Sequence, residues 1–321
     1  MRHRTVDARG TRIHLVEEGE GPIVLLVHGF PESWYSWRHQ LPAIAAAGFR
    51  AVAIDVRGYG RSSKPLDRAA YGMLQHVADN AGVVEALGEE TAIIVGHDWG
   101  SPIAANSALL RPDVFTAVAL LSVAYSPPGR RRPTESFAAM AGPSGDEEFY
   151  INYFQEPGRA EAEIELDVRS WLLGFYFGAS GDSVAPADGG TMATIPRGKQ
   201  MRDRFVIPDP LPRWLTEDDL AFYTAEFERS GFRGPLNRYR NVDRDWVDLT
   251  TWRGSPINVP ALFVGGEKDG PTIWGAHAIA RYPETLPQLR GSHILPGCGH
   301  WIQQERPDEL NELLAGFLQS L

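Results

Sequence analysis

The chain has 321 residues, of which 43% are hydrophobic and 22% charged, so it can bury a core and is not disordered throughout. Its 31 basic and 41 acidic residues give a formal net charge of −10, which disfavours binding to nucleic acid or to anionic membrane surfaces. One cysteine allows no intrachain disulfide, and every apolar run falls short of the roughly 18 residues of a membrane span. We therefore expect a cytoplasmic protein with no signal peptide, nucleic-acid partner or membrane insertion; a homodimer is compatible with these features.

Short apolar runs alternate with longer helical patterns in the first part of the chain. The run 23–27 is continuous and β-branched, which indicates a strand buried on both faces. Strands that alternate with helices are typical of βαβ units, so the sequence predicts a mainly parallel sheet flanked by helices. The predicted strands are 12–17, 23–27, 51–54, 91–95 and 118–123, and the predicted helices are 36–47, 71–87 and 101–110.

The alternation stops at Ser126-Pro127-Pro128-Gly129. From there to about residue 245 the sequence shows helical patterns without buried strands, and 179–212 is rich in Gly, Pro and Asp, which predicts long loops. Strand character returns at 261–264 and weakly at 293–295, before a last helix at 307–318. We therefore predict an α/β core made of residues 1–126 and 246–321. A helical insertion, residues 127–245, would follow the sixth strand and act as a lid.

The strongest local signal is Gly96-His97-Asp98-Trp99-Gly100, which joins a predicted buried strand to a predicted helix. Small residues two positions before and after Asp98 fit the tight strand–turn–helix bend called the nucleophile elbow, which usually carries serine. A carboxylate in that place can attack a saturated carbon and form an ester. An aspartate that only caps the helix is the alternative, and this segment alone leaves the two interpretations equal.

Three further segments follow predicted strands at the same edge of the sheet. His28-Gly29-Phe30-Pro31 and the elbow offer the backbone N–H groups of Phe30 and Trp99 as donors to an oxyanion. Asp269 and His300 each follow a later strand, and each alone is compatible with an ordinary turn. The chain order Asp98, Asp269, His300 matches nucleophile, acid and histidine in α/β-hydrolases, which favours a catalytic role for the three together.

Nearly the whole chain resembles the α/β-hydrolase-fold epoxide hydrolases. The resemblance rests on the motifs above, on Gly58-Tyr59-Gly60-Arg61-Ser62-Ser63, and on Tyr153-Phe154-Gln155-Glu156-Pro157-Gly158 and Asn237-Arg238-Tyr239-Arg240-Asn241 in the insertion. It implies that Tyr153 and Tyr239 are paired lid tyrosines that donate to the epoxide oxygen. From the residues alone, Tyr150, Tyr176 and Tyr223 are equal candidates. One departure is Gly270, because the family usually has an apolar residue after the acid at Asp269.

The resemblance implies hydrolysis of a small-molecule epoxide to a vicinal diol, with no cofactor and no metal. Asp98 would attack an epoxide carbon to form an ester, His300 would activate the water that cleaves it, and Asp269 would orient His300. No His or Cys spacing in the sequence indicates a metal site. The residues expected to line the substrate site are Phe30, Pro31, Trp34 and Trp99.

Two other functions stay open at this point. A haloalkane dehalogenase shares the fold and the aspartate nucleophile, but that family would be expected to carry asparagine as a halide donor where this chain has Phe30. A non-catalytic ligand-binding protein of the same fold could lose its histidine or acid without penalty, whereas this chain keeps both. The balance favours epoxide hydrolysis.

Overall fold

A large, mainly parallel sheet forms the centre of the computed structural model, which describes residues 1–142 and 144–321. Within that described chain the sheet has eight strands in the order β1-β2-β4-β3-β5-β6-β9-β10. The first two strands pair antiparallel, and the pairs from β4 to β10 are parallel. The strands are β1 (Arg2–Ala8), β2 (Thr11–Glu18), β3 (Ile23–Val27), β4 (Arg50–Ile54), β5 (Ala92–His97), β6 (Phe115–Leu121), β9 (Ala261–Gly266) and β10 (Leu289–Leu295).

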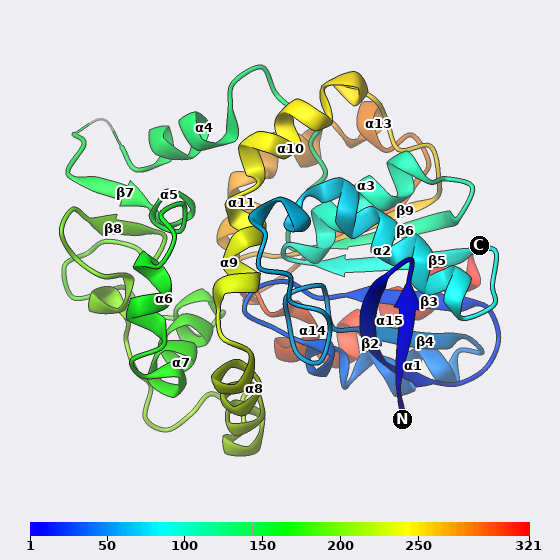
Figure 1. The fold of residues 1–321 in the computed structure, drawn as a ribbon, viewed down its shortest axis with the longest axis horizontal. Helices are drawn as coiled ribbons and strands as arrows, with labels where there is room; N and C mark the ends of the chain where they lie inside the picture. The colour runs from blue at the N-terminus through cyan, green and yellow to red at the C-terminus, as the bar shows by residue number, and fades with distance from the viewer. Residues whose placement is uncertain (143) are drawn as a thin grey trace.

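Helices cover both faces of this sheet, as the continuous apolar strands require (Figure 1). In β3, Val24 and Leu26 pack into one hydrophobic cluster with the side chains of α1 and α15, while Leu25 and Val27 pack into the other with those of α2 and α3. The helices of the core are α1 (Gln40–Ala46), α2 (Met73–Ala86), α3 (Gly100–Leu110), α11 (Gly270–Trp274), α12 (Ala276–Ala280), α13 (Tyr282–Thr285), α14 (Ile302–Glu305) and α15 (Pro307–Gln319).

The segment between β6 and β9 leaves the sheet and forms a helical layer beside it, whose first part lies at the left of Figure 1 and whose last helices lie near its centre. It starts after β6, the strand predicted at 118–123, which is the sixth strand because the unpredicted β1 precedes the others. Its elements are α4 (Pro133–Met140), β7 (Glu147–Phe149), α5 (Tyr150–Tyr153), α6 (Arg159–Ile164), α7 (Val168–Ala179), β8 (Thr194–Pro196), α8 (Glu217–Ser230), α9 (Arg233–Tyr239) and α10 (Val242–Asp248).

The structure differs from the prediction at strands that pair with residues far away in the sequence, at strands with few apolar residues, and at the helix predicted for 36–47. β1 was not predicted, because only Val6 and Ala8 of this edge strand are buried. The short pair of β7 with β8 in the insertion joins segments far apart in sequence, within a region predicted to lack strands. The predicted helix 36–47 is instead a 3₁₀ turn, Trp34–Trp37, followed by α1. Pro42 explains this break, because it lacks an N–H and its ring would clash with the carbonyl four positions earlier.

Candidate active site

Asp98 stands at the bend between β5 and α3, in a left-handed backbone conformation with φ +51°. Non-glycine residues rarely adopt this conformation, and those that do are enriched at functional sites. The chain passes so close to itself here that a Cβ on Gly96 would meet the Gly100 carbonyl, and one on Gly100 would meet the Val27 carbonyl. The two glycines therefore allow the sharp bend that turns the Asp98 carboxylate toward the cavity described below.

The structure brings Asp269 and His300 to this bend from the ends of two other strands. Asp269 follows β9, and His300 lies between β10 and α14. Nδ1 of His300 is 2.8 Å from Oδ1 of Asp269, and Nε2 of His300 is 3.4 Å from Oδ2 of Asp98. The imidazole therefore lies between two carboxylates, one on each ring nitrogen. Asp269 is fully buried, while Asp98 and His300 each keep a small exposed edge.

These contacts set the charges of the site. Burial alone would lower the pKa of His300, but the neighbouring carboxylates of Asp269 and Asp98 outweigh it and raise the pKa well above its ordinary value. Burial opposes ionisation of Asp98 too, yet its hydrogen bond with His300 and the charge of that ring hold its pKa below the usual range. In the free protein the pair is therefore an ionised Asp98 beside a protonated His300.

Of the two predicted oxyanion donors, the Phe30 N–H reaches the carboxylate, at 2.7 Å from Oδ1 of Asp98. The peptide bond that follows, Phe30–Pro31, is cis. Trp99 occupies the N-cap of α3, and within the described chain its N–H makes no hydrogen bond to Asp98. The geometry thus offers one donor aimed at Oδ1, with the N-terminus of α3 beside it.

The structure separates the two insertion tyrosines that the resemblance paired. Tyr239 lines the cavity, but Tyr153 does not: its hydroxyl points to Glu163, donating to Oε2 at 2.5 Å. Tyr150, one helical turn earlier at the start of α5, lines the cavity in its place. The rings of Tyr150 and Tyr239 lie 6.2 Å apart. The two insertion tyrosines that line the cavity are therefore Tyr150 and Tyr239, and not the predicted pair of Tyr153 and Tyr239.

Both cavity tyrosines stay protonated. Burial, and then the negative charge of Asp98, raise the pKa of Tyr150 and of Tyr239 well above their ordinary value. A phenol with a raised pKa keeps its O–H and can donate a hydrogen bond into the cavity. The site thus places two O–H donors in the same cavity as one ionised carboxylate.

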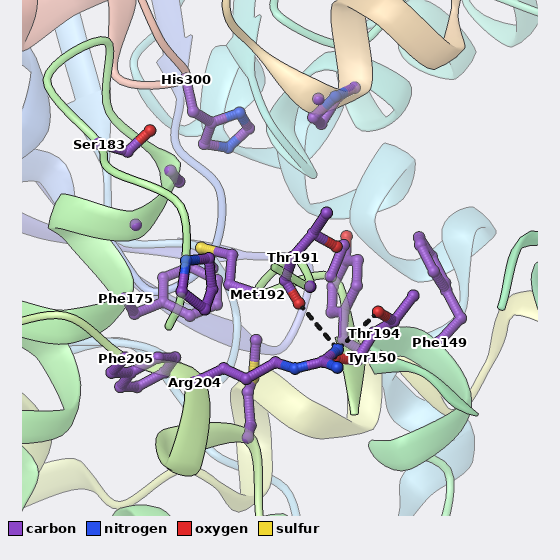
Figure 2. Close-up of a pocket in the computed structure, with 18 of the residues that line it drawn as sticks. Phe149, Tyr150, Phe175, Ser183, Thr191, Met192, Thr194, Arg204, Phe205 and His300 are labelled. Carbon is purple, nitrogen blue, oxygen red and sulfur yellow. Dashed lines mark hydrogen bonds between the residues drawn. The ribbon is translucent and has the colours of Figure 1, made fainter. Parts of the chain in front are cut away.

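The cavity has a volume of about 690 Å³, within the range of pockets that hold drug-sized molecules. Figure 2 shows His300 at one side and Arg204, on the 3₁₀ turn Met201–Arg204, at the other, with apolar and aromatic side chains between them. Within the described residues, no cluster of three or more His, Cys, Asp or Glu side chains is arranged to hold a metal ion. Nor does the described chain contain a helix both long and apolar enough to cross a bilayer. The lining includes Phe30, Asp98, Phe149, Tyr150, Phe175, Met192, Arg204, Phe205, Tyr239, Lys268, Trp274 and His300.

Three of the predicted substrate-binding residues are placed outside this lining. The ring of Trp34 lies nearly perpendicular to the rings of His3 and Phe222. It belongs to the hydrophobic cluster that contains the side chains of α1 and α15. Pro31 is buried, and its carbonyl accepts a hydrogen bond from the Tyr176 hydroxyl. Trp99 lies behind Tyr239, with the two rings perpendicular and 5.1 Å apart. Of the predicted four, only Phe30 lines the cavity.

Sequence reasoning missed most of the insertion residues that form the cavity, such as Met192 and Arg204, because they lie in the segment predicted as loops. It also passed over Ser122, which follows β6 and contacts both Asp269 and His300. The available signal was a serine near the end of the predicted parallel strand 118–123, between the strands that lead to Asp98 and Asp269.

An α/β core with an aspartate at the elbow after β5, paired with a histidine, defines an enzyme class with a carboxylate nucleophile. The family model described as the alpha/beta hydrolase fold matches residues 22–307. Epoxide hydrolase B of Mycobacterium tuberculosis is 46% identical, over 99% of this chain and 98% of that protein. The chain belongs to the epoxide hydrolases of the α/β-hydrolase fold.

Solved structures give the same relationship. The structure of an epoxide hydrolase from an endophytic Streptomyces is 66% identical, with a TM-score of 0.96, over 99% of this chain and 95% of that one. Epoxide hydrolase A from Mycobacterium thermoresistibile is 43% identical, with a TM-score of 0.92, over 99% and 98%. The relatives match almost end to end, so the insertion is part of the similarity.

Proposed function

We propose that this chain hydrolyses an epoxide to a vicinal diol through a covalent ester on Asp98. The observation that carries the proposal is one cavity that holds an ionised carboxylate at the elbow, Asp98, and two protonated phenols from the insertion, Tyr150 and Tyr239. A strained ether ring needs this combination: a nucleophile for carbon and proton donors for the leaving oxygen.

In the first step, the Asp98 carboxylate forms a bond to an epoxide carbon while the bond from that carbon to the ring oxygen breaks. The released oxygen accepts hydrogen bonds from Tyr150 and Tyr239 and takes a proton from one of them. Oδ1 of Asp98 is held by the Phe30 N–H, which leaves Oδ2, the oxygen nearer His300, as the attacking atom.

In the second step, a water molecule cleaves the ester. Alkylation removes the negative charge of Asp98, so His300 loses one of the two carboxylates that raise its pKa. His300 then passes its proton to the tyrosinate left by the first step, and the neutral ring can act as a base. It takes a proton from water, and the hydroxide adds to the Asp98 carbonyl. The Phe30 N–H then stabilises the oxyanion that forms on Oδ1. When this adduct collapses, the bond between the carbonyl carbon and Oδ2 breaks, and the diol leaves with Oδ2, which takes a proton from His300. The proton left on the Asp98 carboxyl then passes to His300, so the starting state is restored and epoxide plus water give the diol.

The insertion acts as a lid in this proposal, with residues 127–245 as its extent. It supplies both tyrosines and most of the cavity wall that faces Asp98. The wall is largely aromatic and aliphatic, so the substrates expected are epoxides with apolar substituents.

The competing function is dehalogenation, which would use the same aspartate. A halide leaves as an anion and needs no proton, whereas the oxygen of an opened epoxide needs one. The O–H donors of Tyr150 and Tyr239 therefore favour an epoxide as the substrate. The test is a paired assay of the purified protein on a terminal aryl epoxide and a primary haloalkane, measuring diol by chromatography and halide by an ion electrode. Diol without halide is expected. Halide without diol would overturn the proposal, and neither product together with no adduct on Asp98 would indicate a ligand-binding protein.

A further inference from the structure

Ser122 is a fully buried serine that the proposed mechanism does not use. It follows β6 directly, between the strand that leads to Asp98 and the strand that leads to Asp269. Its backbone has φ +72°, a left-handed conformation that Asp98 also adopts. In the described chain, only Arg9 is a further non-glycine residue with positive φ. Such strain persists only where surrounding contacts hold it in place.

The contacts that hold Ser122 come from the catalytic loops themselves. Its N–H donates to the Val264 carbonyl at 2.9 Å, and the hydroxyl of Thr272, just after Asp269, lies 2.9 Å from the Ser122 carbonyl. The backbone strain therefore serves to bring one side-chain oxygen, Oγ, to a defined place.

That oxygen lies between the acid and the histidine. Oγ of Ser122 is 2.6 Å from Oδ2 of Asp269 and 2.9 Å from Nδ1 of His300. A hydroxyl has one proton to donate and lone pairs to accept with. The Ser122 hydroxyl donates its hydrogen bond to the Asp269 carboxylate, and the short distance between the two oxygens fits a charge-assisted hydrogen bond. The lone pair then faces Nδ1–H of His300, which also points to Oδ1 of Asp269.

We propose that Ser122 is a positioning residue that aligns His300 for the second step of the reaction. The Ser122 hydroxyl donates to Asp269 and accepts from His300. These two hydrogen bonds fix the carboxylate relative to the imidazole ring and keep the proton on Nδ1. Nε2 is then free to face Asp98 and the attacking water. Among the described residues, Ser122 makes no hydrogen bond to Asp98 or to the two tyrosines, so we expect ring opening not to depend on it. This inference rests on the proposed two-step function.

The test compares two substitutions that both remove Oγ but act oppositely on the backbone. Ser122→Ala keeps a side chain at the strained positive φ, whereas Ser122→Gly relieves it. In both variants we expect kcat to fall about 10- to 100-fold, the scale of a misaligned general base. KM should fall with it, and kcat/KM, which reports alkylation, should change less than about 3-fold. Intact-mass spectra of protein quenched at steady state should show the alkylated form accumulating.

Ser101→Ala is the matched control. Ser101 is a buried serine of α3 whose hydroxyl donates to the carbonyl of Val123, the residue next to Ser122, at 2.6 Å, but it contacts neither Asp269 nor His300. Its loss should lower stability without accumulating the adduct.

Three outcomes would overturn the role of Ser122. They are a wild-type kcat in both variants, a fall of kcat/KM equal to that of kcat, or adduct accumulation in Ser101→Ala as well. Wild-type protein that forms neither diol nor adduct would instead overturn the proposed function itself, so the two failures are distinguishable.

Discussion

The rings of Tyr150 and Tyr239 lie 6.2 Å apart at an interplanar angle of 75°, although one begins α5 and the other ends α9. The ring of Phe154 packs against both tyrosine rings, with its centroid 5.7 Å from that of Tyr150 and 5.0 Å from that of Tyr239. The insertion thus presents two phenols as one unit to the carboxylate of Asp98.

The first prediction separates the two tyrosines of α5. Tyr150→Phe should lower kcat/KM for an epoxide about 100-fold, because it removes one O–H donor to the leaving oxygen. Tyr153→Phe should leave kcat/KM within about 3-fold. It should instead lower the free energy of unfolding by about 1–3 kcal/mol, because Glu163 is buried and loses a donor. Steady-state kinetics and urea unfolding of both variants check this, and the reverse pattern would restore Tyr153 to the site.

The second prediction concerns His300. His300→Gln cannot take a proton from water, so it should stop diol formation while Asp98 still attacks the epoxide. Intact-mass spectrometry should then show one substrate mass added per chain, and digestion should locate it on Asp98. Asp98→Asn is the control and should remain unmodified. Normal turnover by His300→Gln would show that another group activates the water.

The third prediction is a pH dependence that differs between the two steps. The pKa of Asp98 is lowered, so alkylation should persist as the pH falls to about 4, the ordinary range of a carboxyl group. The second step needs neutral His300, whose pKa is raised by Asp98 and Asp269 until alkylation removes the charge of Asp98. Lower pH protonates His300, so the alkylated fraction at steady state should grow as the pH decreases. Quenched-mass measurements across pH check this, with His300→Gln as a control whose adduct shows no such trend.

The fourth prediction concerns the wall of the cavity opposite His300. The guanidinium of Arg204 is nearly buried and forms ion pairs with Glu147 and Asp188, and it hydrogen-bonds the segment at Thr191 and Thr194, as Figure 2 shows for the threonines. Arg204→Met should loosen the segment 191–194 and thereby lower the melting temperature of the protein. It should also change KM more for a bulky epoxide than for a small terminal epoxide.

Arg204→Lys serves as the comparison for that wall. It keeps the charge but loses the planar fork that binds several partners at once, so its effects should be intermediate. Equal KM changes for both substrates, or none, would contradict a role of Arg204 in shaping the cavity.

The core of the fold was predictable because its signals are local. The run Ile23–Val27 is apolar at every position, as a strand buried on both faces requires, and Gly96 and Gly100 mark the bend around Asp98. Edge pairing and the β7–β8 pair were not predictable, because their partners lie far away in sequence and their apolar signal is short.

The sequence by itself predicted the α/β core and the meeting of Asp98, Asp269 and His300, which the structure brings together, since parallel strands bring the residues at their carboxyl ends to one edge. Only the tertiary structure decided which tyrosine of α5 faces the cavity. Tyr150 and Tyr153 are one helical turn apart and chemically alike, and their difference comes from Glu163, a buried carboxylate that accepts from Tyr153. The same holds for Ser122, whose oxygen gains its place from a left-handed backbone that no local pattern reveals. Side-chain direction depends on contacts between different elements, and those contacts exist only in the folded chain.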